Sequence, residues 1–351
     1  MSSVPSVGIA ILNWNGRHFL QTLLPLLQGL HYPNYTIYVI DNHSTDDSVS
    51  FLKRDFPAVK IIPLQDNYGF AKGYNLGLAG IAEDYYLMMN SDVEVGKDLL
   101  QPMVNLMESD KQIAVCQPKI LSLRNKAYFE HAGAAGGMID MLGYPFCRGR
   151  IFDSVEKDNG QYNDVQQVFW ATGTCCLIRK EAYWQVGGMY DYYFMHMEEI
   201  DMCWRLNSAG YIIMYCPQAV VYHLGGGSLP YQSAAKTYYN FRNNLIMCCR
   251  NSPWYINCWL LPLRFLMDAA AALQFATGGN GANTKAIGKA YLHFFKWLFS
   301  REKQSARTKK SLFSLPGVLK KSIVWQYFVR KKKHYTAIVR TGILWIQSIR
   351  E

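Results

Sequence analysis

The chain has 351 residues, half of them hydrophobic and 14% aromatic, which excludes a disordered protein and is enough for one large α/β domain with additions. Its net charge of +10 is unevenly spread: residues 301–351 hold 13 Lys or Arg and two acids, whereas residues 1–300 hold 23 basic and 24 acidic residues. The basic charge therefore belongs to the tail, and such a tail is typical of a protein that meets an anionic membrane surface or a nucleic acid.

The first 120 residues alternate short apolar segments with amphipathic ones. We expect strands at residues 7–12, 35–40, 59–64 and 85–89, and helices at 19–27, 46–54 and 71–81. Ser44 or Thr45 is expected to cap the second of these helices. Alternation at this pitch predicts right-handed βαβ units and a parallel sheet.

The middle of the chain is less regular. We expect a strand at 172–178, a helix at 199–209, two short strands at 212–215 and 220–223, and a helix at 236–250. We divide the chain into an α/β domain over 1–250 and a helical, membrane-associating region over 251–351.

Residues 254–276 are almost continuously apolar and aromatic, interrupted by Pro262, Arg264 and Asp268. A membrane span needs roughly 20 apolar residues, but a central Arg and Asp are expensive in hydrocarbon. An amphipathic helix or hairpin lying in the membrane interface fits better, and a helix packed on the catalytic domain is the alternative. The basic clusters that follow are interleaved with Trp325, Tyr327, Phe328 and Trp345, which suits anionic lipid headgroups better than nucleic acid.

The nine cysteines include no C-x-x-C pair, so we expect reduced, mostly buried thiols in a cytosolic protein. The N-terminus lacks the basic and long apolar regions of a signal peptide, and we do not expect export by that route. The predicted location is the cytoplasm, with peripheral attachment to the inner face of the cell membrane.

A short polar turn, Asn90-Ser91-Asp92, follows the apolar strand at 85–89. Open α/β sheets place their ligands at the carboxyl ends of their strands. A carboxylate there can hold Mg²⁺ or Mn²⁺ against a diphosphate. Asp92 is our predicted metal ligand, although an Asp after a strand is more often a turn or cap residue.

Adjacent carboxylates occur at Glu198 and Glu199, flanked by large apolar residues at the start of the predicted helix. They suit either a helix N-terminus or a base in a poorly hydrated pocket. We expect Glu198 or Glu199 to be the catalytic base, and Asp201 and Arg205 to form a helical ion pair.

His223 ends a predicted strand and is followed by Gly225, Gly226 and Gly227. Glycines allow a close approach between backbone and ligand. We predict that His223 completes the coordination of the cation or contacts the diphosphate.

Polar residues that could bind a nucleotide follow the first three strands. The Asp41 carboxylate can accept the imide N–H of a pyrimidine, and a Gly-containing loop at 67–75 that enters a helix suits ribose and phosphate. The predicted nucleotide-sugar residues are Asn13, Asp41, Asn42, Asn67, Gly69, Lys72, Asn75, Asn90 and Ser91.

With these motifs in place, the chain resembles a family 2 glycosyltransferase of the inverting GT-A type, and especially bacterial rhamnosyltransferase-like enzymes. The resemblance covers roughly residues 5–250. It is carried by segments 13–16, 39–46, 67–71, 90–92, 171–173 and 198–201 and by His223.

The resemblance implies a GT-A fold, that is, a Rossmann-like nucleotide-diphospho-sugar transferase, here with a helical, apolar and basic C-terminal extension. It implies a dTDP- or UDP-sugar donor, a divalent metal and inversion at the anomeric carbon. Asp41 matches the base-binding Asp of the family, Asp92 its metal-binding acid and His223 a His that completes the metal site. The catalytic base of the family is usually the Asp of a Glu-Asp pair; this chain has Glu199 there, which we favour over Glu198. Asn90 likewise replaces one acid of a full D-x-D motif.

The expected function is transfer of a sugar, rhamnose among the candidates, to a saccharide or lipid-linked saccharide in cell-surface polysaccharide synthesis. Within the fold, a UDP-hexose or UDP-galactofuranose donor is the alternative. A non-catalytic glycan-binding module on a membrane scaffold is the alternative from another class. A dinucleotide oxidoreductase is disfavoured because the first βα turn, residues 13–17, lacks the Gly-rich fingerprint.

Overall fold

The computed structural model describes residues 4–130, 133–225, 233–300, 309–339 and 343–344. Its main feature is a large mixed sheet with strand order β11-β13-β6-β12-β4-β1-β2-β3, in which β5 also pairs with β13. The strands are β1 (Val7–Asn13), β2 (Tyr35–Asp41), β3 (Lys60–Pro63), β4 (Tyr85–Met89), β5 (Val93–Val95), β6 (Ile113–Ser122), β11 (Gln166–Gln167), β12 (Cys175–Arg179) and β13 (Ile212–His223).

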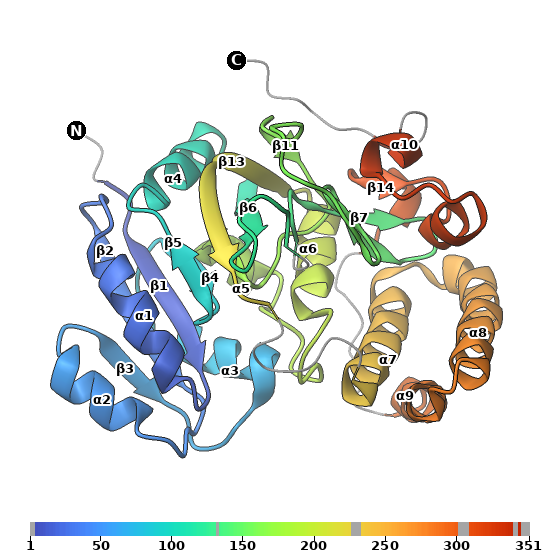
Figure 1. Cartoon of the computed structure of the whole chain (residues 1–351), viewed down its shortest axis with the longest axis horizontal. Helices are drawn as coiled ribbons and strands as arrows, with labels where there is room; N and C mark the ends of the chain where they lie inside the picture. Colours follow the sequence, from blue (N-terminus) through green and yellow to red (C-terminus); the bar gives the residue numbers. More distant parts are fainter. Residues whose placement is uncertain (1–3, 131–132, 226–232, 301–308, 340–342, 345–351) are drawn as a thin grey trace.

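Helices cover both faces of this sheet and continue beyond it at one end of the molecule (Figure 1). They are α1 (Arg17–Gln28), α2 (Ser48–Asp55), α3 (Gly69–Leu78), α4 (Leu100–Ser109), α5 (Lys180–Gln185), α6 (Glu198–Ala209), α7 (Ala234–Asn251), α8 (Trp254–Thr277), α9 (Gly281–Leu298) and α10 (Tyr335–Val339). Helices α7, α8 and α9 lie together, far from β3 and α2.

The first strand shows why the sheet is covered on both sides. Val7, Ile9 and Ile11 of β1 pack in one core with α1 and α4, whereas Ala10, on the opposite face of the same strand, packs in a second core with α3 and α6. Successive side chains of a strand point to opposite faces. A strand that is apolar at every position therefore becomes a central strand of a two-sided sheet.

Strands β1, β2, β3 and β4 run parallel, as predicted. In their register, Asn13 stands opposite Asp41, and both are the last residues of their strands. The predicted cap of α2 was wrong: the helix begins after Asp47, and the Asp46 carboxylate accepts the Ser48 N–H at 3.0 Å. Ser44 is instead bonded to Asn13.

Beyond β4 the sheet becomes mixed. β12 lies antiparallel to both β4 and β6, and β13 lies parallel to β6. The two strands predicted at 212–215 and 220–223 are one strand, β13, with a register shift between Cys216 and Val220. Residues 217–219 have no partner on β6, so the pairing is interrupted there although the strand continues.

A smaller sheet, with order β10-β9-β8-β7-β14-β15, stands beside the large one. Its strands are β7 (Gly137–Asp140), β8 (Pro145–Cys147), β9 (Arg150–Ile151), β10 (Ser154–Val155), β14 (Val318–Leu319) and β15 (Ile343–Leu344). β14 pairs in parallel with β7 although nearly 180 residues separate them. The segment after α9 therefore returns to the α/β part of the chain, and the boundary predicted at residue 250 falls in the last turn of α7.

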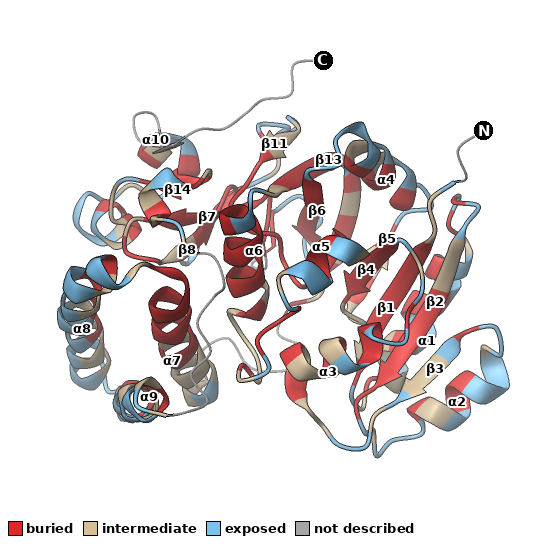
Figure 2. Cartoon of the chain, turned by 180° about the vertical axis from the view of Figure 1, so that it is seen from behind, coloured by how far each residue is buried: buried red, intermediate tan, exposed pale blue. Residues whose placement is uncertain are grey.

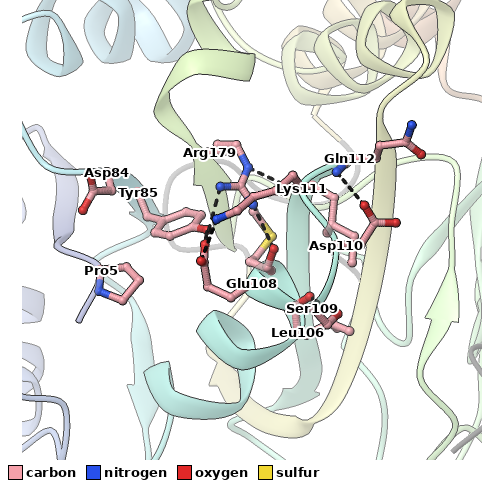
Figure 3. A network of polar contacts seen from close by, with 12 residues as sticks. Pro5, Asp84, Tyr85, Leu106, Glu108, Ser109, Asp110, Lys111, Gln112 and Arg179 are labelled. Carbon is pink, nitrogen blue, oxygen red and sulfur yellow. Dashed lines mark hydrogen bonds and ion pairs between the residues drawn. The ribbon is translucent and has the colours of Figure 1, made fainter. Parts of the chain in front are cut away.

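A polar network fixes the amino end of β4, the end away from the turn at 90–92 (Figure 3). The Tyr85 hydroxyl bonds to Glu108 of α4, and Arg179, the last residue of β12, lies 3.5 Å from the same carboxylate. Arg179 also donates to the Met107 carbonyl at 2.8 Å. The network ties α4 to β4 and β12. These contacts fix the strands at the end opposite to the turn at 90–92.

Candidate functional site

Asn13 and Asp41 form the first part of the site. Both side chains are buried at the ends of neighbouring parallel strands, and Asn13 Nδ2 lies 3.4 Å from Asp41 Oδ1 and 3.1 Å from the Ser44 hydroxyl. The Ser44 N–H also donates to the Asp41 carboxylate. Asn13 Oδ1 is buried and has no hydrogen-bond partner among the described residues. A buried acceptor of this kind is costly unless a ligand donates to it, so the pair suits the N–H edge of a base.

The loop into α3 forms the second part. The buried Asn42 amide accepts the Tyr68 N–H and donates to Asn67 Oδ1 and to the Gly69 carbonyl. Gly69 has φ of +73° and packs so tightly that a Cβ there would lie 2.5 Å from the Phe194 carbonyl oxygen. Only glycine meets both conditions without strain. The loop is therefore held against the segment that leads to Glu198 and Glu199.

Lys72 and Asn75 of α3 have different surroundings. The Lys72 ammonium lies 4.3 Å from the centre of the Tyr68 ring and stays half-buried. Asn75 donates to the Met189 carbonyl and to Asp191, and it accepts from the Met189 N–H and the Tyr183 hydroxyl. Both polar atoms of the Asn75 side chain are thus hydrogen-bonded within the protein, and these bonds position the loop before α6.

Asp92 and His223 meet where β4 and β13 end. His223 Nε2 lies 3.2 Å from Asp92 Oδ1 and 3.5 Å from Asn90 Nδ2, and the Leu224 N–H donates to the Asp92 carbonyl. The predicted metal ligands are therefore side by side. Ser91 is half-buried in the same turn. Gly226 and Gly227, which we expected to open this end of the strand to a ligand, lie outside the described residues.

Glu130 is a member of this cluster that sequence reasoning missed. Its buried carboxylate lies 3.0 Å from His223 Nδ1, so His223 stands between two acids. Burial lowers the pKa of His223, but the hydrogen bonds with Asp92 and Glu130 outweigh it and raise the pKa to about 9. No local pattern around residue 130 marks it, because the contact joins residues 93 positions apart.

Glu198 and Glu199 begin α6, and one carboxylate oxygen of each is buried without a hydrogen-bond partner among the described residues. Burial raises the pKa of both carboxyl groups. The charge of Glu199 raises the pKa of Glu198 further, whereas the N–H groups of Gly173 and Ile200 partly offset the shift of Glu199. The charge of Glu199 thus adds to the cost of ionising Glu198, and the choice of Glu199 as the base stays a prediction.

A chain of contacts joins the glutamates to the Asp92–His223 cluster. Gly173, whose N–H faces Glu199, precedes Thr174, and the Thr174 carbonyl accepts the Asn90 N–H at 2.9 Å. Cys147 gives a second link: burial raises the pKa of its thiol to about 12, and the charges of Glu130 and Glu199 contribute to the rise. The charges of Glu130 and Glu199 thus both act on one buried thiol.

The backbone before α6 is held in an uncommon conformation. His196 and Met197 are consecutive non-glycine residues with φ of +67° and +75°. Such strain persists only where the surroundings enforce it. Here the buried Asn243 amide of α7 donates to the Met195 and His196 carbonyls at 2.7 and 2.8 Å. Burial and the charge of Lys236 lower the pKa of His196 to about 4, so this ring is neutral at pH 7.

Asp201 has the structural role predicted for it. Its fully buried carboxylate binds Arg205, four residues along α6, at 2.9 Å and Arg250 of α7 at 2.7 and 2.8 Å. Asn251 donates to it as well. The contacts lock the helix that carries Glu199 onto α7.

The donor atoms at the end of β4 suit a divalent cation as part of a larger set. Two ligands at about 2.1 Å in neighbouring octahedral positions lie roughly 3 Å apart, close to the 3.2 Å between Asp92 Oδ1 and His223 Nε2. The contact of Nδ1 with Glu130 is the outer-shell support that metal-binding histidines have. Within the described ranges, however, no group of three or more His, Cys, Asp or Glu could hold a metal alone. A cation here needs further ligands, and diphosphate oxygens can supply them.

A sequence model of the family described as "Glycosyl transferase family 2" matches residues 6–187, which include Asn13, Asp41, Asp92 and Gly173. Among curated relatives, N-acetylglucosaminyl-diphospho-decaprenol L-rhamnosyltransferase of Mycobacterium tuberculosis is 26% identical, over 76% of this chain and 90% of the relative. Rhamnosyltransferase WbbL of Escherichia coli is 27% identical, over 43% of this chain and 58% of the relative.

Solved structures show the same fold. Mannosyltransferase PcManGT from Pyrobaculum calidifontis, solved with GDP-Man and Mn²⁺, superposes with a TM-score of 0.53 at 15% identity, over 85% of this chain and 89% of that one. The predicted GT-A fold with a helical C-terminal region is confirmed.

Proposed function

Because this chain belongs to glycosyl transferase family 2 and is a glycosyltransferase, we propose that it moves a sugar from a nucleoside diphosphate to a saccharide or lipid-linked saccharide with inversion at the anomeric carbon. The observation that carries the proposal is the Asp92–His223 pair at the strand ends, which is joined to Glu199 through Gly173 and the hydrogen bond between Thr174 and Asn90. A glutamate that ionises in a poorly hydrated site is a general base. The neighbouring carboxylate and imidazole are ligands for the cation that a diphosphate leaving group needs.

Each part of the site has a role in this proposal. Asn13 and Asp41 bind the base of the nucleotide, and Asn42 holds the loop at 67–69 in place for the ribose and phosphates. Asp92 and His223 would hold Mg²⁺ or Mn²⁺, whose charge stabilises the leaving diphosphate, with Glu130 orienting the imidazole. Asn90 and Ser91 line the same turn.

Glu199 then takes the proton of the acceptor hydroxyl as that oxygen attacks the anomeric carbon from the face opposite the diphosphate. The bond between the anomeric carbon and the diphosphate oxygen breaks in the same step, so the configuration inverts. In this proposal Glu198, whose pKa is raised by burial and by the charge of Glu199, stays protonated and adds no second negative charge beside Glu199.

We propose rhamnose as the first donor sugar to test, since the relatives named above are rhamnosyltransferases. The name of the mycobacterial relative specifies a sugar on a diphospho-decaprenol as its acceptor, which supports a lipid-linked acceptor here. We also propose that the enzyme works at the cytoplasmic face of a membrane. The direct test is a panel of dTDP-rhamnose, UDP-hexoses and UDP-galactofuranose, with Mg²⁺ or Mn²⁺ and with a chelator, assayed for the released nucleotide.

Replacement of the base is the sharpest test of the mechanism. Glu199→Gln keeps the shape of the side chain but cannot accept a proton, so we expect transfer to fall by about 10²–10⁴-fold, the usual contribution of general-base catalysis. Donor affinity, measured by calorimetry with the free nucleotide, should change little. Glu198→Gln is the matched control and should keep most activity. Equal loss of transfer and nucleotide binding in the Glu199 variant would contradict the assignment.

A further inference from the structure

Helix α8 buries its charged side chains and exposes its apolar ones, which is the opposite of a usual amphipathic surface helix. Its charged residues, Arg264 and Asp268, are both 1% exposed, whereas its outer face is apolar. Figure 2 shows exposed residues along the outside of this helix. The large side chains on that face are Trp254, Tyr255, Trp259, Leu263, Phe265, Leu266 and Leu273, with 65% of Leu266 and of Leu273 exposed. No Asp, Glu, Lys or Arg lies on it.

The buried charges fix how α8 can meet a membrane. Arg264 donates to the Leu142 carbonyl at 3.0 Å, and its guanidinium stacks on the Tyr144 ring at 3.8 Å. Asp268 accepts hydrogen bonds from the hydroxyls of Tyr144 and Tyr291. The helix is long and apolar enough to cross a membrane, and only 22% of its most apolar 18-residue stretch is buried inside the protein. Its middle is nevertheless attached to the domain and to α9, so lipid cannot surround it, and it must lie along a surface.

The neighbouring helix α9 carries positive charge on its exposed side, where Lys289 also lies over the Tyr238 ring of α7. Lys285, Lys289 and Lys296 of α9 are exposed, and they alternate with exposed Leu292 and Phe295 on the same helix. From residue 254 to residue 299 the only acid is the buried Asp268. Lysine next to aromatic and aliphatic side chains is the composition that fits anionic headgroups above acyl chains.

The segment after α9 extends the same kind of surface. Trp259 of α8 stacks on Phe313, with ring centres 6.3 Å apart, and Figures 1 and 2 both place the segment between β14 and α10 next to α8. In that segment Trp325, Phe328 and Val329 are exposed immediately before the exposed Arg330 and Lys331. An apolar patch bordered by basic residues is thus repeated in a part of the chain distant in sequence.

We propose that the outer face of α8, with the adjoining face of α9, inserts into the headgroup region of an anionic bilayer, with α8 lying in the membrane plane. Large exposed apolar patches mark interaction surfaces, and the outer face of α8 is such a patch. The lysines beside it select a negatively charged lipid surface over a neutral one. The inference rests on this surface alone and holds whether or not the proposed sugar transfer is correct.

Flotation of the full-length protein with vesicles tests the proposal. Vesicles of phosphatidylcholine with about 30% phosphatidylglycerol should carry the protein, and pure phosphatidylcholine should carry at least tenfold less, because the lysines contribute through anionic headgroups. Bound protein should remain bound in about 0.5 M NaCl, since inserted apolar side chains are not screened by salt. Release by salt would overturn insertion, and equal binding to both vesicles would overturn the role of the lysines.

Matched variants identify the surface. The triple variant Phe265→Ser, Leu266→Ser and Leu273→Ser should lose at least tenfold in vesicle binding while its melting temperature and nucleotide affinity stay unchanged. Leu76→Ser, an exposed leucine on α3, is the control and should bind as wild type does. Undiminished flotation of the triple variant would overturn the proposal. So would a wild-type dimer in solution that the triple variant converts to monomer, because a second copy would then be the occupant of this face.

Discussion

Glu198 and Glu199 are neighbours in sequence, but the protein holds their carboxyl groups differently. Gly173 and Ile200 direct N–H groups at Glu199, whereas Glu198 is more buried and is exposed to the charge of Glu199. Two neighbouring like charges in a buried site cannot both form cheaply. Backbone N–H groups partly offset the raised pKa of both carboxyl groups, but only Glu198 has its pKa raised further by the charge of its neighbour.

The raised pKa of Glu199 predicts how the rate of transfer depends on pH. Burial raises the pKa of Glu199 above its usual value of 4.5. Because the base must be ionised, transfer should fall by about tenfold per pH unit once the pH drops below that raised pKa. The profile of kcat against pH should thus have an acid limb with an apparent pKa above 4.5. Glu198→Gln should keep this limb, and a rate that rises as the pH falls would contradict Glu199 as the base.

Glu130 gives a prediction about metal affinity. Its carboxylate contacts His223 Nδ1 and leaves Nε2 directed at Asp92. Removal of such an outer-shell partner usually costs about 10–100-fold in metal affinity. We expect Glu130→Gln to raise the Mn²⁺ concentration for half-maximal activity by that factor. Glu94→Gln, which breaks an exposed ion pair with Lys126 in the turn after β6, should leave it unchanged; an equal effect of both variants would contradict the role of Glu130.

The sequence allowed us to find the site residues that follow predicted strands, but not Glu130, which follows a strand that was not predicted. Asp92 and His223 could be paired because each ends a predicted strand, and strand ends gather at one sheet edge. Glu130 lies after β6 in a stretch where no element was predicted. Its contact depends on how β6 and β13 pair, which a single sequence does not show.

At the scale of elements, α6 holds the base in place through Asp201. Removal of one partner of a buried ion pair leaves the others uncompensated and costs about 3–5 kcal/mol. We expect Asp201→Asn, which leaves Arg205 and Arg250 without their carboxylate, to lower the free energy of unfolding by that amount. Asp98→Asn, at an exposed pair with His31, should change it by less than about 0.5 kcal/mol. Denaturant titration of both variants provides the measurement.

The same carboxylate predicts how stability depends on pH. Burial raises the pKa of Asp201, but Arg250 and Arg205 outweigh it and hold the pKa below the usual 3.8. A depressed folded-state pKa contributes stability that is present above pH 3.8 and is lost as the pH falls through the lower value. Wild-type stability should therefore fall more steeply below pH 3.8 than that of Asp201→Asn. Parallel curves for the two proteins in acid would contradict this linkage.

The elements between residues 7 and 89 were predictable because the strands are short and apolar and alternate with amphipathic helices, whereas β5, α4 and β6, which follow them, were not predicted. Residues 124–171 were not, because β7, β8, β9 and β10 are two to four residues long and two-residue strands leave no periodicity to detect. Their pairing also needs β14, which comes from the other end of the chain. The missing information was long-range, not local.

At the scale of the whole molecule, the chain after α9 belongs to the catalytic part as much as to the helical one. The Ile323 N–H donates to the buried Asp140 carboxylate, and the Tyr335 N–H donates to Glu156. Gly317 fits so closely on Phe169 that a Cβ there would lie 2.7 Å from the Phe169 backbone nitrogen. The predicted division at residue 250 remains a prediction about membrane association, but the two parts share a sheet.

Truncation tests this architecture. A chain that ends after residue 308 loses β14 and with it Val318, Leu319 and Ile323, each fully buried. Burial of one such side chain contributes about 1.5–3 kcal/mol, so the three together approach the whole stability of a domain of about 5–15 kcal/mol. We expect this chain to aggregate or to melt well below wild type. A chain that ends after residue 339 keeps all three residues and should melt close to wild type in differential scanning fluorimetry. If the shorter chain folded and bound nucleotide as wild type does, the C-terminal segment would be an appendage, and the shared sheet would carry no stability.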